Sequence, residues 1–229
     1  MHNGNISNLL IEDHHLIKKN HIYCLSKLDS RELYQIQITL KGVKVTSQTY
    51  YEKCFSNFKL DWKKIYLLPR QVSIDTTLRM FQYKLLHNVL YLKKMLFRFN
   101  ISQEPYCSFC NLEEETPLHT FYECVYTQNL WVQLQAYLAE KLYLPSLTPQ
   151  SAIFGFWDID SECKIIINHL LLIFKYNIFK SRNKKKLCFQ ILKTDIRKIK
   201  NIEEKISLTN ASKEIQYCKK WRQISEKIS

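Results

Sequence analysis

The stretch Cys107-Ser-Phe-Cys110, followed after eight residues by His119 and after four more by Cys124, is the most informative part of this chain. Three thiols and one imidazole fall within eighteen residues. Zinc takes four such ligands at about 2.0 to 2.3 Å, and a two-residue gap between cysteines lets one tight turn present both sulfurs to the same ion. The spacing therefore predicts one structural zinc ion held by all four side chains.

The second half of this motif carries a geometric constraint. Thr116 followed by Pro117 is typical of an N-cap with proline at the first helical position, which puts His119 in the first turn of a helix. Positions five apart on an α-helix point about 140° away from each other, so an unbroken helix cannot aim both His119 and Cys124 at one metal. We therefore expect a kink or break between residues 123 and 125.

Two alternatives to a metal site stay open at this point. The chain holds eight Cys and seven His, so four unrelated residues could share the stretch. A disulfide between Cys107 and Cys110 is the second alternative. The start, Met1-His-Asn-Gly-Asn, has no basic region followed by an apolar core, so nothing suggests export to an oxidising compartment, and free thiols are expected.

Composition favours helices. Of 229 residues, 46% are hydrophobic, and only three are Gly and five Pro, which argues against disorder and against a turn-rich β-sandwich. The longest apolar run, residues 165–179, is interrupted by polar residues and is too short to cross a bilayer, so it is expected to be a buried helix. The sequence predicts a mainly α fold: an irregular helical bundle organised around one CCHC zinc site, with little or no β structure.

Apolar residues recur at helical spacing in several segments, among them residues 75–96, 127–142, 161–183, 187–207 and 211–228. The pair His87-Asn88 could split the first of these in two, and Pro69 is expected to end the helix capped by Asp61. Residues 151–157 fit either a short strand or an apolar connector that fills the bundle. The predicted division is a helical lead-in at 1–60, a zinc-binding helical domain at 61–145, a connector at 146–160, and basic helices at 161–229.

The positive charge is concentrated in the last third of the chain. Residues 1–163 hold 17 Lys and Arg against 16 Asp and Glu, whereas residues 164–229 hold 17 against 5, so nearly all of the net +13 lies there. A concentrated positive field attracts polyanions, and the neutralised phosphates release counterions, which indicates a nucleic-acid partner. A plainly solvated face and an acidic membrane surface are the alternatives.

Several motifs together resemble a known family. They are Leu78-Arg-Met-Phe-Gln-Tyr-Lys-Leu-Leu-His87, Tyr106-Cys-Ser-Phe-Cys-Asn111, Glu114-Glu-Thr-Pro-Leu-His-Thr-Phe-Tyr-Glu-Cys124 and Trp131. This pattern closely resembles the C-terminal zinc-binding region of reverse transcriptases from LINE-type, non-LTR retrotransposons. The resemblance implies that Cys107, Cys110, His119 and Cys124 are the metal ligands, and that the region grips template RNA or target DNA during target-primed reverse transcription. It also implies an intracellular protein of the nucleus, the cytoplasm or both.

No catalytic activity is expected. The chain shows no aromatic-x-Asp-Asp polymerase signature and no endonuclease constellation, so it is similar to a detached or truncated tail of such a polyprotein. Four protein ligands leave no open position on the zinc for a reactive water. The metal motif is also surrounded by glutamates, with no Lys or Arg between residues 99 and 140, so it would repel phosphates and is interpreted as a structural clip.

The expected partner is therefore RNA or DNA backbone, bound with low sequence specificity, with no membrane and no small-molecule substrate. The candidate phosphate contacts are Lys180, Arg182, Lys184, Lys185, Lys186, Lys193, Arg197, Lys198, Lys200, Lys219, Lys220 and Arg222. Core packing is favoured over base stacking for Trp221. Two alternatives remain: a helical module that docks a polymerase domain or another protein, and a functionless remnant of an element.

Overall fold

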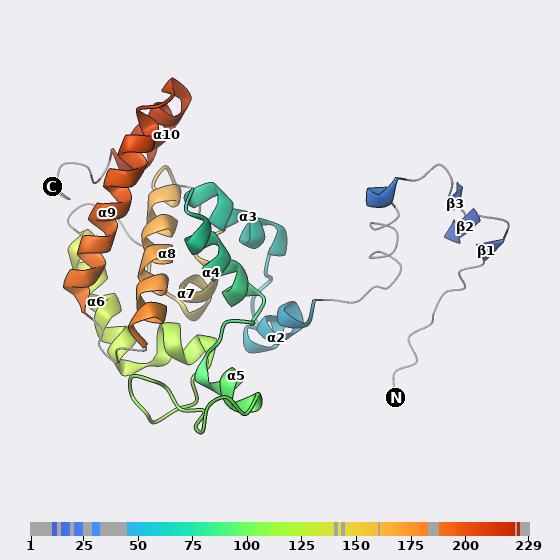
Figure 1. Cartoon of the computed structure of the whole chain (residues 1–229), viewed down its shortest axis with the longest axis horizontal. Helices are drawn as coiled ribbons and strands as arrows, with labels where there is room; N and C mark the ends of the chain where they lie inside the picture. Colours follow the sequence, from blue (N-terminus) through green and yellow to red (C-terminus); the bar gives the residue numbers. More distant parts are fainter. Residues whose placement is uncertain are drawn as a thin grey trace. The chain divides into compact units, whose positions relative to one another are not determined.

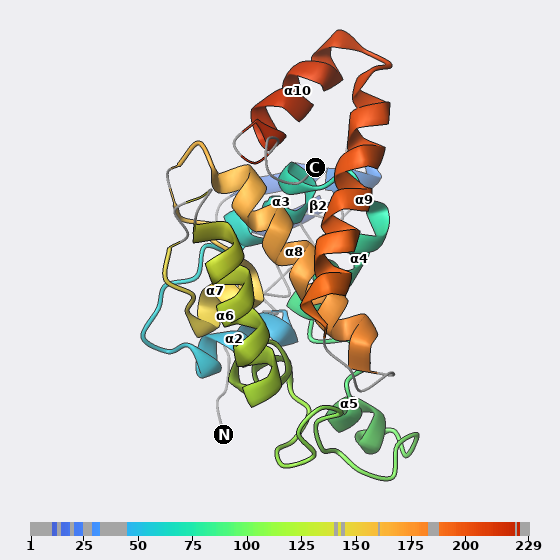
Figure 2. The same cartoon turned by 90° about the vertical axis from the view of Figure 1, so that its left-hand side faces the viewer.

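The buried helix α8, Lys164–Ser181, is the element around which the other helices pack. The computed structural model describes residues 11–12, 15–18, 21–24, 29–32, 45–139, 142, 145–159, 161–182, 188–222 and 224. Two units separate within it, residues 1–45 and residues 46–229. In the larger unit, α8 contacts α3, α4, α9 and α10, and Figures 1 and 2 show it in the middle of the bundle.

The larger unit is helical. Its elements are α2 (Thr46–Cys54), α3 (Trp62–Val72), α4 (Thr76–Leu86), α5 (Lys93–Arg98), the π-helix η2 (His119–Glu123), α6 (Val125–Ala139), α7 (Pro149–Phe154), α8, α9 (Phe189–Ser207) and α10 (Ala211–Trp221). The mainly α prediction is confirmed, with little β structure among the described residues.

The smaller unit differs from the helical lead-in predicted for residues 1–60. Residues 11–24 contain three short antiparallel strands, β1 (Ile11–Glu12), β2 (His15–Lys18) and β3 (His21–Cys24), in the order β1-β2-β3. Leu16 faces Tyr23 and Ile17 faces Ile22 across the second pairing. Branched and aromatic residues fit a pleated surface, which explains the preference for strands here. The rest of the four-part division stays a prediction.

The apolar stripe of α8 explains its central place. Ile166, Leu170, Phe174 and Ile178 are all buried, as their spacing predicts. Trp131 of α6 stacks against Phe174 with ring centroids 3.8 Å apart. Burying such side chains stabilises the fold by about 1.5 to 3 kcal/mol each, so this stripe supplies much of the driving force for packing.

Two local expectations concern helix ends. Asp75 accepts hydrogen bonds from Thr77 N and Leu78 N and begins α4, and the helix ends at Leu86, so His87-Asn88 does separate α4 from α5. Asn88 adopts a positive φ of 52°, which breaks the helix. The expectation that Pro69 ends α3 was wrong: the helix continues to Val72 because the buried Leu68 and Val72 outweigh the one backbone bond that proline removes.

Residues 149–154 form helix α7, not the short strand considered for residues 151–157. Thr148 and Ser151 make a reciprocal capping box, and Pro149 occupies the first turn. All four residues from Ser151 to Phe154 are buried, so α7 fills the bundle as an apolar connector would. It ends at Gly155, where φ is 83° and a Cβ would lie 2.5 Å from Asn168 Oδ1, so only glycine fits.

Candidate metal centre

The loop that carries the first two cysteines is a tight hairpin. We refer to residues 105–124 as the metal loop. Tyr106 and Glu114 form an isolated antiparallel bridge, and Cys107 N donates to Glu113 O at 2.7 Å. Asn111, at a positive φ of 56°, closes the turn, and its N–H donates to Cys107 O. Phe109 N also donates to Cys107 Sγ at 3.4 Å, so the backbone directs this sulfur into the turn.

The other two ligands come from a π-helical turn. His119 N donates to Thr116 Oγ1, which confirms the predicted cap, and Pro117 follows it. The turn η2 runs from His119 to Glu123, and Cys124 N donates to His119 O at 2.8 Å, a bond five residues long. Cys124 is then extended, with φ −61° and ψ 127°, before α6 begins. The predicted break is confirmed, and the wider π turn brings His119 and Cys124 to the same side.

Side chains of α6 stabilise this break. A π turn followed by an extended residue leaves carbonyls without helical partners, and buried carbonyls need them. Thr127 Oγ1 donates to Thr120 O at 2.9 Å, and Trp131 Nε1 donates to Phe121 O at 2.8 Å. The buried Phe121 ring also packs edge-on against Phe81 of α4. The metal loop is thus joined both to α4 and to α6.

The structure brings the four predicted ligands together. The ligand atoms of Cys107, Cys110, His119 and Cys124 all lie within 4.8 Å of one another, and they are the Cys3His group among the described residues. Cys107 Sγ and Cys124 Sγ are 3.8 Å apart, and Cys110 Sγ and His119 Nε2 are 3.3 Å apart. A tetrahedral zinc site has ligand separations of about 3.5 to 3.8 Å. The cluster can therefore hold a single zinc ion.

The donor chemistry also fits a metal. Cys107 and Cys124 are fully buried and His119 nearly so. The hydrogen bond between the two thiols raises the pKa of Cys107 and lowers the pKa of Cys124 to about 7, so Cys107 is the thiol of the pair that keeps its proton more firmly. Zinc displaces such a proton, because a coordinating thiol is deprotonated. Four protein ligands then close the coordination sphere, which is the arrangement of structural sites.

The comparison with known families agrees with this geometry. Residues 45–131 match a family model described as zinc-binding in reverse transcriptase. The match runs from the start of α2 to Trp131, whose indole holds the π turn, so the reverse-transcriptase zinc-binding pattern covers the metal loop and the helices that support it. That family is defined by metal binding and not by catalysis. No curated protein and no solved structure matches the chain.

A buried ion pair that the sequence did not reveal ties the metal loop to α8. Glu115 is fully buried and pairs with Arg182, just beyond the end of α8. Its carboxylate also accepts from Ser108 N at 2.7 Å and Lys93 N at 3.0 Å. Burial alone would raise the pKa of Glu115, but Arg182 and these hydrogen bonds outweigh burial and lower it. Glu115 thus joins the cysteine turn, the start of α5 and α8.

This pairing corrects one predicted phosphate contact. Arg182 is buried, donates to Tyr91 O at 2.9 Å and lies over the Phe179 ring, so its charge is used inside the protein. It is not available to a polyanion. In the sequence, Glu115 is one of three consecutive glutamates and Arg182 one of many basic residues, and no spacing links positions 67 apart. Glu104, Glu113, Glu114 and Glu123 are exposed, so the rest of the loop is acidic as expected.

Lys220 was also predicted to contact phosphates, and it too is paired inside the protein. Its Nζ lies 2.8 Å from both carboxylate oxygens of Glu203, and Glu203 also accepts from the indole of Trp221, which is buried as expected. The same Nζ lies 2.7 Å from His169 Nδ1 in α8. Burial and the Lys220 charge lower the pKa of His169 to about 3, so the ring is neutral. This polar cluster fastens α9 and α10 to α8.

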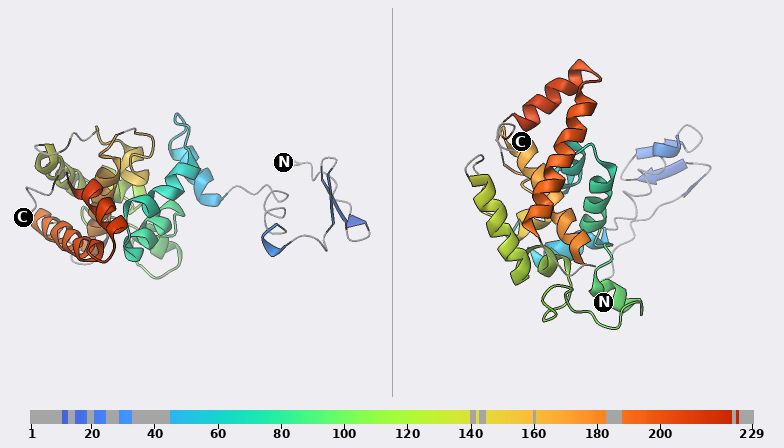
Figure 3. Two further views of the ribbon diagram at one scale, coloured as in Figure 1. Left: turned by 90° about the horizontal axis from the view of Figure 1, so that it is seen from above. Right: turned by 60° about the vertical axis from the view of Figure 1, so that its left-hand side comes forward.

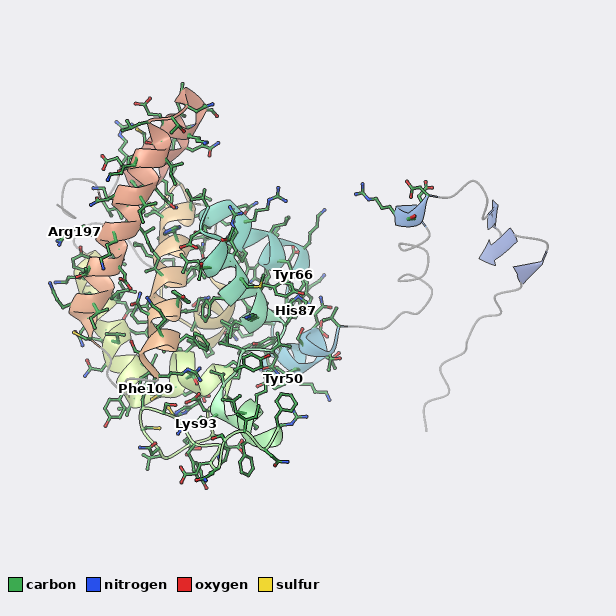
Figure 4. All side chains as sticks on the ribbon, viewed as in Figure 1. Tyr50, Tyr66, His87, Lys93, Phe109 and Arg197 are labelled. Carbon is green, nitrogen blue, oxygen red and sulfur yellow. The ribbon has the colours of Figure 1, made fainter. Side chains whose placement is uncertain are left out.

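The remaining predicted cations are distributed over α8, α9 and α10. Lys180 is half-exposed and pairs with Asp195 at 3.2 Å, and Lys193 lies 5.2 Å from the ring centroids of Tyr137 and Phe189. Arg197, Lys198, Lys219 and Arg222 are exposed and Lys200 is partly so. Arg197 lies at the outer edge of α9 in Figure 4. Lys184, Lys185 and Lys186 lie outside the described residues.

Proposed function

We propose that this chain is a non-catalytic, zinc-organised nucleic-acid-binding tail, similar to the C-terminal region of a non-LTR retrotransposon reverse transcriptase. The observation that carries the proposal is the joining of two parts. A Cys3His cluster matching a reverse-transcriptase zinc-binding family is tied by the Glu115–Arg182 pair to a helical body whose α9 and α10 expose basic residues.

The two parts have different roles in this proposal. The metal loop exposes carboxylates and would repel phosphates, so zinc organises the fold and does not touch the nucleic acid. Exposed lysines and arginines of α9 and α10 contact backbone phosphates, which position a nucleic acid without reading its bases. RNA and DNA backbones are both accepted in this mode, and specificity is low.

A second candidate function rests on a different surface. Large apolar side chains around the metal loop are exposed, which is a feature of protein-docking patches: Phe97, Phe99, Ile101, Tyr106, Leu112, Val125 and Tyr126. The exposed glutamates of the loop lie in the same part of the sequence as these side chains. A protein surface that is apolar at its centre and basic at its rim, such as one on a polymerase domain, would complement this patch.

A salt series tests the nucleic-acid proposal. Binding of a fluorescein-labelled oligouridylate to the zinc-loaded chain is followed by anisotropy between about 50 and 200 mM salt. Affinity is expected to fall about 10- to 100-fold over this range, because each neutralised phosphate of a single strand contributes about −0.7 to the slope of log K against log salt. Absent or salt-independent binding would contradict the proposal.

Matched charge reversals separate specific contacts from net charge. Arg197→Glu with Lys198→Glu on α9 should weaken binding and reduce the salt slope by about 0.7 per lost contact. Lys53→Glu with Lys63→Glu, exposed positions on α2 and α3, makes the same change in net charge. If both pairs have equal effects, the α9 surface has no special role. Neither pair alters the exposed apolar side chains around the metal loop, so docking of a polymerase domain at that patch should be the same in both variants.

A further inference from the structure

A groove lies between the α3–α4 junction and the α9–α10 hairpin. Its volume is about 830 Å³, within the range of about 300 to 1,000 Å³ found for sites that hold small organic ligands. Arg70, Val72 and Arg79 line one side, and Ile206, Lys213 and Lys219 line the other. Figure 3 shows α9 and α10 as the two-helix hairpin that forms this second wall.

The charge in this groove is strongly positive. Among the described lining residues, six are Lys or Arg and two are Glu. One of the two acids, Glu203, is bound by Lys220 and Trp221, so its charge is already neutralised. The cations come from α3, α4 and α10 and converge on one space, which distinguishes them from the solvated face of a single helix. Arg70 and Arg79 belong to the part of the chain whose net charge is nearly zero.

The groove is also lined by apolar side chains. Val72 is buried, and Ile165, Ile206 and Tyr217 line the same groove. Tyr217 is only partly covered, and its ring leans on Trp221 at a centroid distance of 6.5 Å. The contacts of Lys220 with Glu203 and His169 hold the second wall in place. Proteins that bind single-stranded nucleic acids combine a positively charged groove with aromatic rings on which the bases stack.

We propose that this groove binds a single-stranded segment of nucleic acid, with a phosphate between Arg70 and Lys213 and a base stacked on Tyr217. The inference rests on the proposed function and gives it a location apart from the outer face of α9. A duplex hides its base faces inside its own stack, so it could offer only phosphates to the rim. The groove therefore selects single strands over duplexes.

Charge reversal in the groove tests the inference. Arg70→Glu with Lys213→Glu is compared with Lys53→Glu plus Lys63→Glu, which changes net charge equally outside the groove. Anisotropy with the labelled oligouridylate and with its duplex is the measurement, and far-UV circular dichroism confirms folding. The groove pair is expected to weaken single-strand binding at least about 10-fold more than the control pair, and to weaken duplex binding no more than the control pair does.

A stacking test is independent of charge. Tyr217→Ala is expected to lower single-strand affinity about 5- to 100-fold, whereas Tyr217→Phe keeps the ring and should bind as the parent does. If the groove pair and the control pair behave alike, the groove inference is overturned. The proposed function still stands in that case, provided that the parent binds in a salt-dependent manner and the α9 pair weakens it. Absence of binding by the parent overturns both.

Discussion

Lys175 is an unusual residue for the centre of a helical bundle. Its side chain on α8 is buried, and its Nζ donates to Ile153 O, an oxygen that also accepts from Gln82. Burial lowers the pKa of its ammonium group from 10.5 to about 7. An amine that loses its charge at neutral pH costs the fold less than a buried ion, but the folded state must still release a proton that the unfolded chain keeps.

Lys175 therefore makes stability depend on pH in a predictable direction. Between pH 7 and about 10.5 the unfolded chain binds more protons at this site than the folded chain, so the free energy of unfolding rises with pH. From pH 7 to 9 the rise from this residue is about 2 kcal/mol. Lys175→Met should unfold with a higher free energy at pH 7 and should lose this rise. Urea denaturation of the zinc-loaded chain at the two pH values measures both.

Lys180→Met is the control for this prediction, because Lys180 lies on the same helix with a half-exposed side chain paired to Asp195. An exposed pair contributes about 0 to 1 kcal/mol, so this variant should keep the pH dependence of the parent. A Lys175→Met protein that is less stable at pH 7 and keeps the same rise would show that Lys175 is charged in the folded state.

At the scale of elements, the Glu115–Arg182 pair is expected to carry the connection between the metal loop and α8. Arg182→Met leaves the fully buried Glu115 carboxylate without its cation, a change that costs about 3 to 5 kcal/mol in buried pairs. Because Glu115 also orders Ser108 beside Cys107, zinc affinity should fall as well. Urea denaturation and competition with a chromogenic chelator measure the two effects.

The double variant Glu115→Leu with Arg182→Met distinguishes two causes of lost stability: the loss of the ion pair itself, and the unpaired buried carboxylate that the single variant leaves. It should be more stable than Arg182→Met alone, since no buried carboxylate remains. Lys94→Met breaks the exposed Lys94–Glu114 pair beside the loop and should change stability by less than about 1 kcal/mol. Equal losses in the single and double variants would mean that Arg182 acts by packing on Phe179 and not by charge.

Local signals in the sequence predicted the elements they cap. Thr116-Pro117 predicted the helix start before His119, and Asp61 predicted that of α3. Thr148 and Pro149 begin α7 in the same way, but the apolar run that follows has no helical periodicity, because every residue from Ser151 to Phe154 is buried, and so it fitted a strand or a connector as well. Helix ends that depend on tertiary burial, such as that of α3 after Pro69, have no signal in the local sequence.

The candidate site also has features that the sequence predicted and features that it did not. Ligand spacing predicted the cluster of Cys107, Cys110, His119 and Cys124, because a metal imposes its geometry on nearby residues. The π-helical form of the break could not be read from composition. The sequence also could not show that Arg182 and Lys220 form ion pairs inside the fold, since a buried cation and an exposed one are the same residue type in a sequence. Only partners distant along the chain distinguish them.

At the scale of the whole molecule, the unit formed by residues 46–229 has two chemically different ends. The metal loop, with its exposed glutamates, lies beside α5 at the end opposite α10 in Figures 1 and 2, and the basic hairpin of α9 and α10 forms the other. No helix of the described residues combines the length and the apolar character needed to cross a membrane. The two ends would let one partner dock at the metal loop while a nucleic acid occupies the hairpin.

The metal loop is fixed to α4, α6 and α8 through Phe121, Trp131 and Glu115, so a zinc ion held by its four ligands would stabilise these connections. The most direct test is zinc K-edge X-ray absorption on the purified chain. One zinc per chain is expected, with three sulfur neighbours at about 2.3 Å and one nitrogen at about 2.0 Å. A folded chain without zinc, or a zinc surrounded only by oxygen and nitrogen, would contradict this account of the fold.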